Sequence, residues 1–190
     1  MKSLEEYIQQ AAKGGHTRSG MILGIRMALL GLQELAIKDP REHHRNLVII
    51  VEIDRCLPDA LEMVAGCRLG NRTLKLRDMG KMAATFVDLK AERAVRLAAR
   101  EGANKRAREM SPLQDKEDAL TNAYRTLSDG ELFTRRFVRV ALAPVDIPGY
   151  WATRQLCAEC GESISFGREV VEAQRTLCRS CAGETYYEPL

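Results

Sequence analysis

The stretch Leu47-Val-Ile-Ile-Val51 decides the fold of the N-terminal part of this chain, which has 190 residues. All five residues are apolar and four of them are β-branched, so no polar position alternates with the apolar ones. Such a run is typical of a strand that is buried on both faces. We therefore expect this strand to lie inside a core that other elements cover.

Helices are predicted on both sides of this strand. The first covers residues 3–13 and ends at Gly14-Gly15. The second runs from about Ser19 to Lys38, and its apolar positions are too dense for a narrow stripe, so we expect it to be well buried. A third is expected over residues 58–65, just after the strand, with Gly66 at its end.

Further strands are expected at residues 73–77, 82–89 and 136–143, and a further helix at residues 115–127. Helices and strands are thus intermixed without strict alternation, which favours an α+β fold over a doubly wound sheet. Pro144 and Pro148-Gly149 then interrupt the pattern. We place a domain boundary there, with an α+β core domain over residues 1–149 and a small second domain over residues 150–190.

The composition is that of an ordinary globular protein, with 45% hydrophobic and 29% charged residues. The net charge of +3 and the pI near 8.6 are too weakly basic to indicate nucleic-acid binding by themselves. No apolar stretch approaches the length of a membrane span, and the first residues lack the pattern of a signal peptide. We expect a cytoplasmic location, where paired cysteines are metal ligands rather than disulfides.

Four cysteines near the C-terminus have the spacing of a metal site: Cys157-Ala-Glu-Cys160 and Cys178-Arg-Ser-Cys181, separated by seventeen residues. Two tight turns of this kind can direct four thiolates at one point, as tetrahedral Zn²⁺ requires. We expect a zinc ribbon with one structural Zn²⁺ per chain, because four protein ligands leave no open position for a substrate. Iron in place of zinc and a redox role for the thiols are the alternatives.

The details of these two cysteine pairs, Cys157-Ala-Glu-Cys-Gly161 and Leu177-Cys-Arg-Ser-Cys181, resemble the DksA/TraR-type zinc finger. Zinc ribbons contact nucleic acids, contact proteins or stabilise a fold. Basic and acidic residues are mixed in this tail: Arg154, Arg168, Arg175, Arg179, Glu159, Glu162, Glu169 and Glu172. The mixture argues against nucleic-acid binding.

The core domain has candidate site residues in loops beside helix starts, where sites are usually built. His16 lies in a glycine-rich loop that enters the second helix, and Cys56 follows the buried strand at the start of the third. A thiolate is favoured near a helix N-terminus. Asp59, in the first helical turn, could orient a ligand or cap the helix. The alternative for Cys56 and Cys67 is a small buried apolar residue, and for His16 a surface or helix-capping position.

Several of these segments are similar to the E-subunit family of formylmethanofuran dehydrogenase. The resemblance begins with Gly-His-x-x-x-Gly-x-x-Leu-Gly-x-Arg-Met-Ala at residues 15–28. The segment Val51-Glu-Ile-Asp-Arg-Cys-Leu-Pro-Asp-Ala60 looks like the family's Glu-x-x-x-Cys-x-x-Asp-Ala, and Gly-Cys-x-x-Gly and Gly-Lys elements follow at residues 66–74 and 78–81. The matches occur in the right order over about residues 15–98.

This resemblance implies an α+β core that is commonly dimeric, with a cleft lined by His16, Cys56 and Cys67 and with Asp59 and Lys81 nearby. Such a cleft would bind a small ligand, a second metal ion or a protein partner. The partner could be an oxidoreductase complex like the one that gives the family its name. The family opening typically reads His-Gly-His-x-Cys-Pro-Gly. This chain has Gly14, Arg18 and Ser19 where the first His, the Cys and the Pro would stand, so two soft ligands are absent.

Three functions are open at this point. The first is a zinc-binding accessory protein of the E-subunit type, and the second is an enzyme with a Lewis-acid metal in the His16/Cys56 cleft. The third is a regulator that uses its zinc finger on nucleic acid or a polymerase. The sequence leaves open whether the protein catalyses a reaction. We also expect a homodimer, because the helix at residues 19–38 is more apolar than one domain of this size needs.

Overall fold

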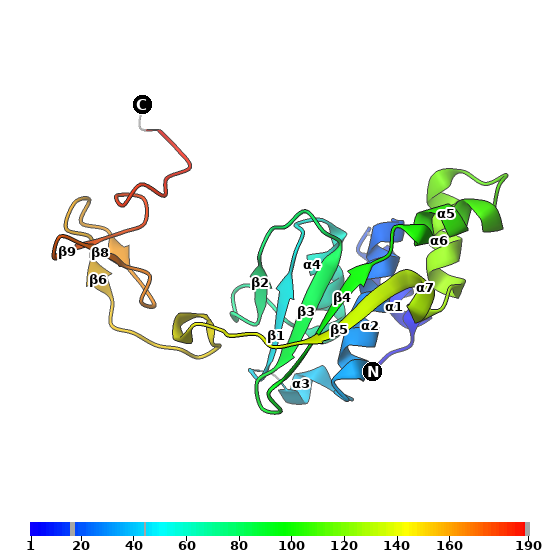
Figure 1. Ribbon diagram of the computed structural model, residues 1–190, viewed down its shortest axis with the longest axis horizontal. Helices are drawn as coiled ribbons and strands as arrows, with labels where there is room; N and C mark the ends of the chain where they lie inside the picture. The colour runs from blue at the N-terminus through cyan, green and yellow to red at the C-terminus, as the bar shows by residue number, and fades with distance from the viewer. Residues whose placement is uncertain (16–17, 44, 189–190) are drawn as a thin grey trace. The chain divides into compact units, whose positions relative to one another are not determined.

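The computed structural model describes residues 1–15, 18–43 and 45–188. The chain falls into two compact units, Met1–Val140 and Ala141–Leu190 (Figure 1). The first unit combines helices with a five-stranded sheet, and the second has two short hairpins. The predicted α+β class is confirmed.

The sheet of the first unit has the strand order β2-β1-β3-β4-β5 (Figure 1). Its strands are β1 (Leu47–Val51), β2 (Leu74–Leu76), β3 (Ala83–Asp88), β4 (Arg93–Ala99) and β5 (Phe133–Val138). The β1 and β2 strands are parallel, and the other neighbours are antiparallel. The strand expected at residues 47–51 is therefore present, and all of its residues except Ile50 are buried, as its apolar run predicts.

Seven helices occur among the described residues of this unit. They are α1 (Leu4–Lys13), α2 (Ser19–Glu34), α3 (Pro40–His43), α4 (Cys56–Ala65), α5 (Gly102–Met110), α6 (Lys116–Thr126) and α7 (Asp129–Leu132). The α2 helix ends four residues earlier than Lys38, because Ala36 adopts a left-handed backbone with φ of 58°. The N–H group of Ile37 then donates to the carbonyl of Leu32, which closes the helix end.

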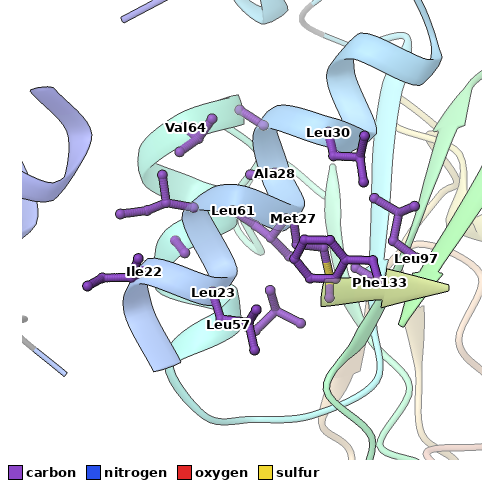
Figure 2. Close-up of a cluster of buried hydrophobic side chains, with 14 of the residues drawn as sticks. Ile22, Leu23, Met27, Ala28, Leu30, Leu57, Leu61, Val64, Leu97 and Phe133 are labelled. Atoms are coloured by element: carbon purple, nitrogen blue, oxygen red, sulfur yellow. The ribbon is translucent and has the colours of Figure 1, made fainter. Parts of the chain in front are cut away.

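The α2 helix packs between α4 and the sheet, and two glycines make this close approach possible. A Cβ atom on Gly24 would lie 2.7 Å from the Cβ of Ala60 in α4. A Cβ atom on Gly31 would lie 2.4 Å from the ring of Phe86 in β3. Figure 2 shows the side chains at this junction, with Leu57 and Leu61 of α4 beside α2. Each large apolar side chain buried here stabilises the fold by about 1.5–3 kcal/mol.

Arg26 fixes α2 to the C-terminal end of α6. Its guanidinium group donates to the carbonyl oxygens of Tyr124 and Leu127, at 2.8 and 2.9 Å, and to the carboxylate of Asp129, at 2.6 Å. A cation is favoured at this end of a helix, where carbonyl groups lack partners. The side chain is 13% exposed, and its role is structural.

The second unit has very little hydrophobic core. It contains a short 3₁₀ helix, η1 (Pro144–Asp146), and four short strands: β6 (Gln155–Leu156), β7 (Ser163–Ile164), β8 (Val170–Glu172) and β9 (Arg175–Leu177). Its buried cluster consists of Cys157, Ile164 and Leu177. A unit of this size needs an additional constraint such as a metal ion.

None of the helices in the described part of the chain is long and apolar enough to cross a membrane.

Candidate metal centre and core pocket

The four cysteines predicted as ligands converge in the second unit. Their sulfur atoms all lie within 4.8 Å of one another, and those of Cys160 and Cys178 are 3.9 Å apart. Tetrahedral zinc with Zn–S bonds of about 2.3 Å places its sulfur ligands about 3.8 Å apart. The cluster therefore fits a four-thiolate zinc ion in both ligand type and spacing.

Backbone groups orient the sulfur atoms within this cluster. The N–H group of Cys178 lies 3.3 Å from the sulfur of Cys157, and that of Cys181 lies 3.4 Å from the sulfur of Cys178. The N–H group of Cys178 is the main reason that the pKa of Cys157 falls to about 6. The neighbouring sulfur of Cys178 instead raises the pKa of Cys181. Four thiolates this close ionise together only when a cation offsets their mutual repulsion.

Most arginines of the second unit have acidic partners within the same unit. Arg175 pairs with Glu159 at 3.3 Å, and Arg179 pairs with Glu184 at 3.5 Å. Arg168 also forms an ion pair, with Asp146 at 3.4 Å. These pairs offset part of the positive charge of the second unit.

A pocket of about 440 Å³ lies at the N-terminal end of α2 in the first unit. Four segments that are distant in the sequence line it: Ser19, Gly20 and Leu23; Gly80, Lys81 and Met82; Ala98, Ala99, Arg100, Glu101 and Asn104; and Tyr124. Lys81, predicted as a cleft residue, is among them. Cys56 lies directly behind Gly20, since a Cβ atom there would be 3.5 Å from the Cys56 sulfur. The structure thus brings two of the predicted residues to one place.

The helix hairpin of α5 and α6 supplies pocket residues that the sequence did not indicate. The hydroxyl of Tyr124 donates to the side-chain carbonyl of Asn104 at 3.1 Å. Burial raises the pKa of Tyr124, and the negative charges of Glu101 and Glu117 raise it further. Its phenol therefore stays protonated, and its one O–H group is the donor to Asn104.

Glu117 is a second residue that the sequence did not indicate. Its carboxylate accepts a hydrogen bond from the backbone N–H of Ser19, although the two residues are 98 positions apart. Arg18, the N-cap of α2, makes no side-chain cap. An acidic group from α6 thus satisfies the N-terminus of α2, which favours negative charge. No local signal around Glu117 could have shown this contact.

The other predicted cleft residues lie elsewhere or are not described. Asp59 lines a different pocket, of about 640 Å³, which α1 and α4 border. Cys67 is 2% exposed, and burial raises the pKa of its thiol to about 12, so it belongs to the core. His16 lies outside the described residues. The predicted grouping of Cys67 and Asp59 with Cys56 in one cleft is not what the structure shows.

The described residues contain one group of three or more His, Cys, Asp or Glu side chains with ligand atoms close enough to hold a metal ion. This group is the set of four cysteines. Within the same residues, the core pocket has no comparable ligand cluster to support the second metal ion that the sequence left open.

The α+β core and the four-cysteine cluster together define a two-part protein with a zinc finger. Residues 14–134 match the model of the FmdE family, described as "FmdE, Molybdenum formylmethanofuran dehydrogenase operon". Residues 152–187 match the prokaryotic dksA/traR C4-type zinc finger. The chain belongs to the FmdE family, and the resemblances found in the sequence are confirmed.

Two known proteins are similar over almost the whole chain. One is a probable S-adenosyl-L-methionine-binding protein of Archaeoglobus fulgidus, 26% identical over 90% of this chain. The match covers 51% of that relative, so the chain spans about half the length of the curated relative it matches. The other is the crystal structure of an FmdE-like protein of the tungsten formylmethanofuran dehydrogenase type from Syntrophus aciditrophicus. It has a TM-score of 0.66 and 24% identity, over 98% of this chain and 96% of that one, and it shows the shared fold.

Proposed function

We propose that this protein is a zinc-binding accessory protein of the FmdE family that binds a small ligand in the core pocket. The observation that carries the proposal is the meeting of three separate family-like segments at one pocket. Gly20 and Lys81 line it, and Cys56 lies behind Gly20. A volume of about 440 Å³ is within the usual range of small-molecule sites.

The zinc ion has a structural role in this proposal. Cys157, Cys160, Cys178 and Cys181 would hold one Zn²⁺, and the closed set of thiolates leaves no position for substrate. The ion would supply the constraint that the small buried cluster of the second unit lacks. The proposed ligand site and the metal site thus consist of different residues and bind different kinds of ligand.

The pocket lining suits a ligand with both acidic and basic groups. Lys81 and Arg100 offer positive charge, Glu101 offers negative charge, and Tyr124 offers an aromatic ring and a hydroxyl oxygen that can accept a hydrogen bond. S-adenosyl-L-methionine has a carboxylate, a cationic ammonium and sulfonium, and an adenine ring. The name of the Archaeoglobus relative makes it the first ligand to test, and we propose it on these two grounds.

Isothermal titration calorimetry with S-adenosyl-L-methionine tests this function on the zinc-loaded full chain. We expect saturable binding that Lys81→Met weakens by about tenfold to a hundredfold, because a charge-assisted hydrogen bond to the carboxylate contributes about 1.5–3 kcal/mol. Lys105→Met is the matched control, since Lys105 is exposed on α5 and does not line the pocket. Absence of binding at millimolar ligand would exclude this molecule. Equal losses in both variants would contradict the assignment of the pocket.

A further inference from the structure

The β5 strand forms one edge of the five-stranded sheet, and among the described residues it pairs only with β4. A hydrogen bond just before β5 shows which of its backbone groups face β4. The N–H of Arg100 donates to the carbonyl of Leu132 at 2.8 Å, so these two residues form a hydrogen-bonded pair. Hydrogen-bonded residues alternate along an antiparallel ladder. Thr134 and Arg136 therefore bond to β4, and the backbone N–H and C=O groups of Arg135 and Phe137 point away from the sheet.

The side chains along this edge are exposed to solvent. Arg135, Arg136 and Phe137 are all exposed, and Phe137 keeps 60% of its surface accessible. Phe137 is in register with the buried Val95 and so lies on the same face of the sheet. The α2 helix ends at Glu34, whose carboxylate meets Arg135 at 2.5 Å, so the helix stops short of Phe137.

The charge around this edge is predominantly positive. A shallow pocket of about 370 Å³ beside Phe137 is lined by Arg93, Arg139 and Glu92 among others. Arg135 and Arg136 add two further positive charges, of which Glu34 balances the first. A second copy of the same strand would bring arginines against arginines, and like charges disfavour such self-pairing. The edge is thus complementary to a negatively charged occupant.

We propose that β5 is a docking edge for an extended acidic segment of a partner protein, which adds to the sheet as a sixth strand. The outward backbone groups of Arg135 and Phe137 would pair with the main chain of the segment. Its carboxylates would meet Arg136 on one face of the sheet, and an apolar side chain would rest against Phe137 on the other face. Main-chain pairing favours a peptide over a nucleic acid, because only a peptide offers alternating N–H and C=O groups along its length.

The first test measures binding of three fluorescent probes to the zinc-loaded full chain by anisotropy. They are an acetylated peptide of alternating Glu and Val, the same peptide with Lys in place of Glu, and a single-stranded oligothymidine. We expect the acidic peptide to bind at least about tenfold more tightly than the other two, because its charge complements the edge. Equal binding of both peptides would overturn the proposal. Tighter binding of the oligothymidine would also overturn it and assign the edge to nucleic acid.

Matched variants separate the side-chain contribution from the main-chain one. Arg136→Glu should weaken the acidic peptide about tenfold, whereas Lys105→Glu, the same charge change on α5, should leave it unchanged. Phe137→Pro removes an outward N–H group without removing a bond to β4, and Phe137→Ala keeps that group. We expect the proline variant to bind more weakly than the alanine variant at similar melting temperatures. Equal binding of these two variants would contradict strand addition.

Amide hydrogen exchange gives a readout at single residues. On addition of the acidic peptide, the amides of Arg135 and Phe137 should gain protection, while the already bonded amides of Thr134 and Arg136 should change little. Protection that appears elsewhere in the chain, with none at these two amides, would overturn the proposal. The outcome is independent of ligand binding in the core pocket.

Discussion

The thiol of Cys67 lies among apolar side chains, with its sulfur 3.7 Å from the carbonyl oxygen of Leu47. Burial raises its pKa from the ordinary value of 9.0 to about 12. It therefore stays neutral at physiological pH and behaves as a small core residue. Cys157 has the opposite setting, because backbone N–H groups lower its pKa to about 6. The two cysteines have different chemistry because they have different neighbours.

Cys67 should make the protein less stable in alkali. Its folded pKa is raised, so the stability it contributes is complete below the unfolded pKa of 9.0 and is lost as pH rises toward about 12. Between about pH 8 and about pH 10.5 this loss amounts to about 2 kcal/mol. Urea unfolding of the wild type and of Cys67→Ala at both pH values measures it. The variant should lose about 2 kcal/mol less over this range, and identical losses would disprove the assignment.

Residue patterns predicted the pocket only in part. Cys56 was singled out because it follows the buried strand at a helix start, and Lys81 because it stands in a Gly-Lys element that resembles the family. Cys67 stands in a similar motif, but its burial depends on packing that a motif does not report. Glu117 was missed because its partner, the N–H group of Ser19, is 98 positions away in the sequence. That partner is also a backbone group, which almost every residue carries, so no residue type marks it.

At the scale of elements, the contact between α2 and β3 depends on the absence of a side chain at Gly31. Three ring atoms of Phe86 lie between 2.4 and 2.6 Å from where a Cβ atom would be. Gly31→Ala should therefore destabilise the protein by about 3 kcal/mol, even though alanine favours a helix by about 1 kcal/mol. Chemical denaturation measures the change in the free energy of unfolding.

Gly70→Ala is the matched control for this substitution. A Cβ atom on Gly70 would have no neighbour within 4 Å, and the backbone there is not left-handed. Its effect should stay within about 0.5 kcal/mol. If both alanine variants were equally stable, the close packing of α2 on Phe86 would be refuted.

The four short strands of the second unit should depend on zinc for their order. We expect about one zinc per chain, lost on Cys178→Ser, because the thiolate set must be complete for tight binding. Trypsin should then cut at Arg168, Arg175 and Arg179 while the first unit stays intact. Metal analysis and mass spectrometry of the digest measure both effects. Cys56→Ser is the control, and loss of zinc in that variant would argue for a metal ion in the core instead.

Elements were predictable where the local pattern was also the structural cause. The apolar run at residues 47–51 became β1 because burial on both faces selects such residues. The last strand of the sheet was misplaced, since alternation at residues 136–143 suggested a strand that the structure has at Phe133–Val138. The pairing of β5 with β4 ends at Val138 and Ala94, and β4 itself begins only one residue earlier, at Arg93. The later residues of the predicted strand therefore have no strand to pair with.

The homodimer is a prediction at the scale of the whole molecule. The argument from the apolar α2 helix no longer supports it, because α4, the sheet and α6 bury that helix within one chain. What remains is the family resemblance, which implies a dimeric core. Light scattering at micromolar concentration should give twice the chain mass of 21.3 kDa. A mass of a single chain would contradict the prediction.

The arrangement of the whole molecule was predictable in outline. The α+β class and the zinc finger followed from periodicity and cysteine spacing, which are local properties. The pocket did not follow from them, because it is built where four distant segments meet, and a loop contact between such segments leaves no periodic trace. Sequence reasoning therefore identified some residues at the pocket but not the segments that form its walls.

The two attachments of α6 to α2 differ in strength, and this difference sets how the pocket could open. At one end Arg26 makes three hydrogen bonds, and at the other Glu117 makes one to the N–H of Ser19. Thermal motion should therefore release the Glu117 end first, with the Arg26 end as the hinge. The N-terminal end of α6 would then move away from Ser19, which lines the pocket, while Tyr124, another pocket residue, would stay in place because Arg26 holds its carbonyl group.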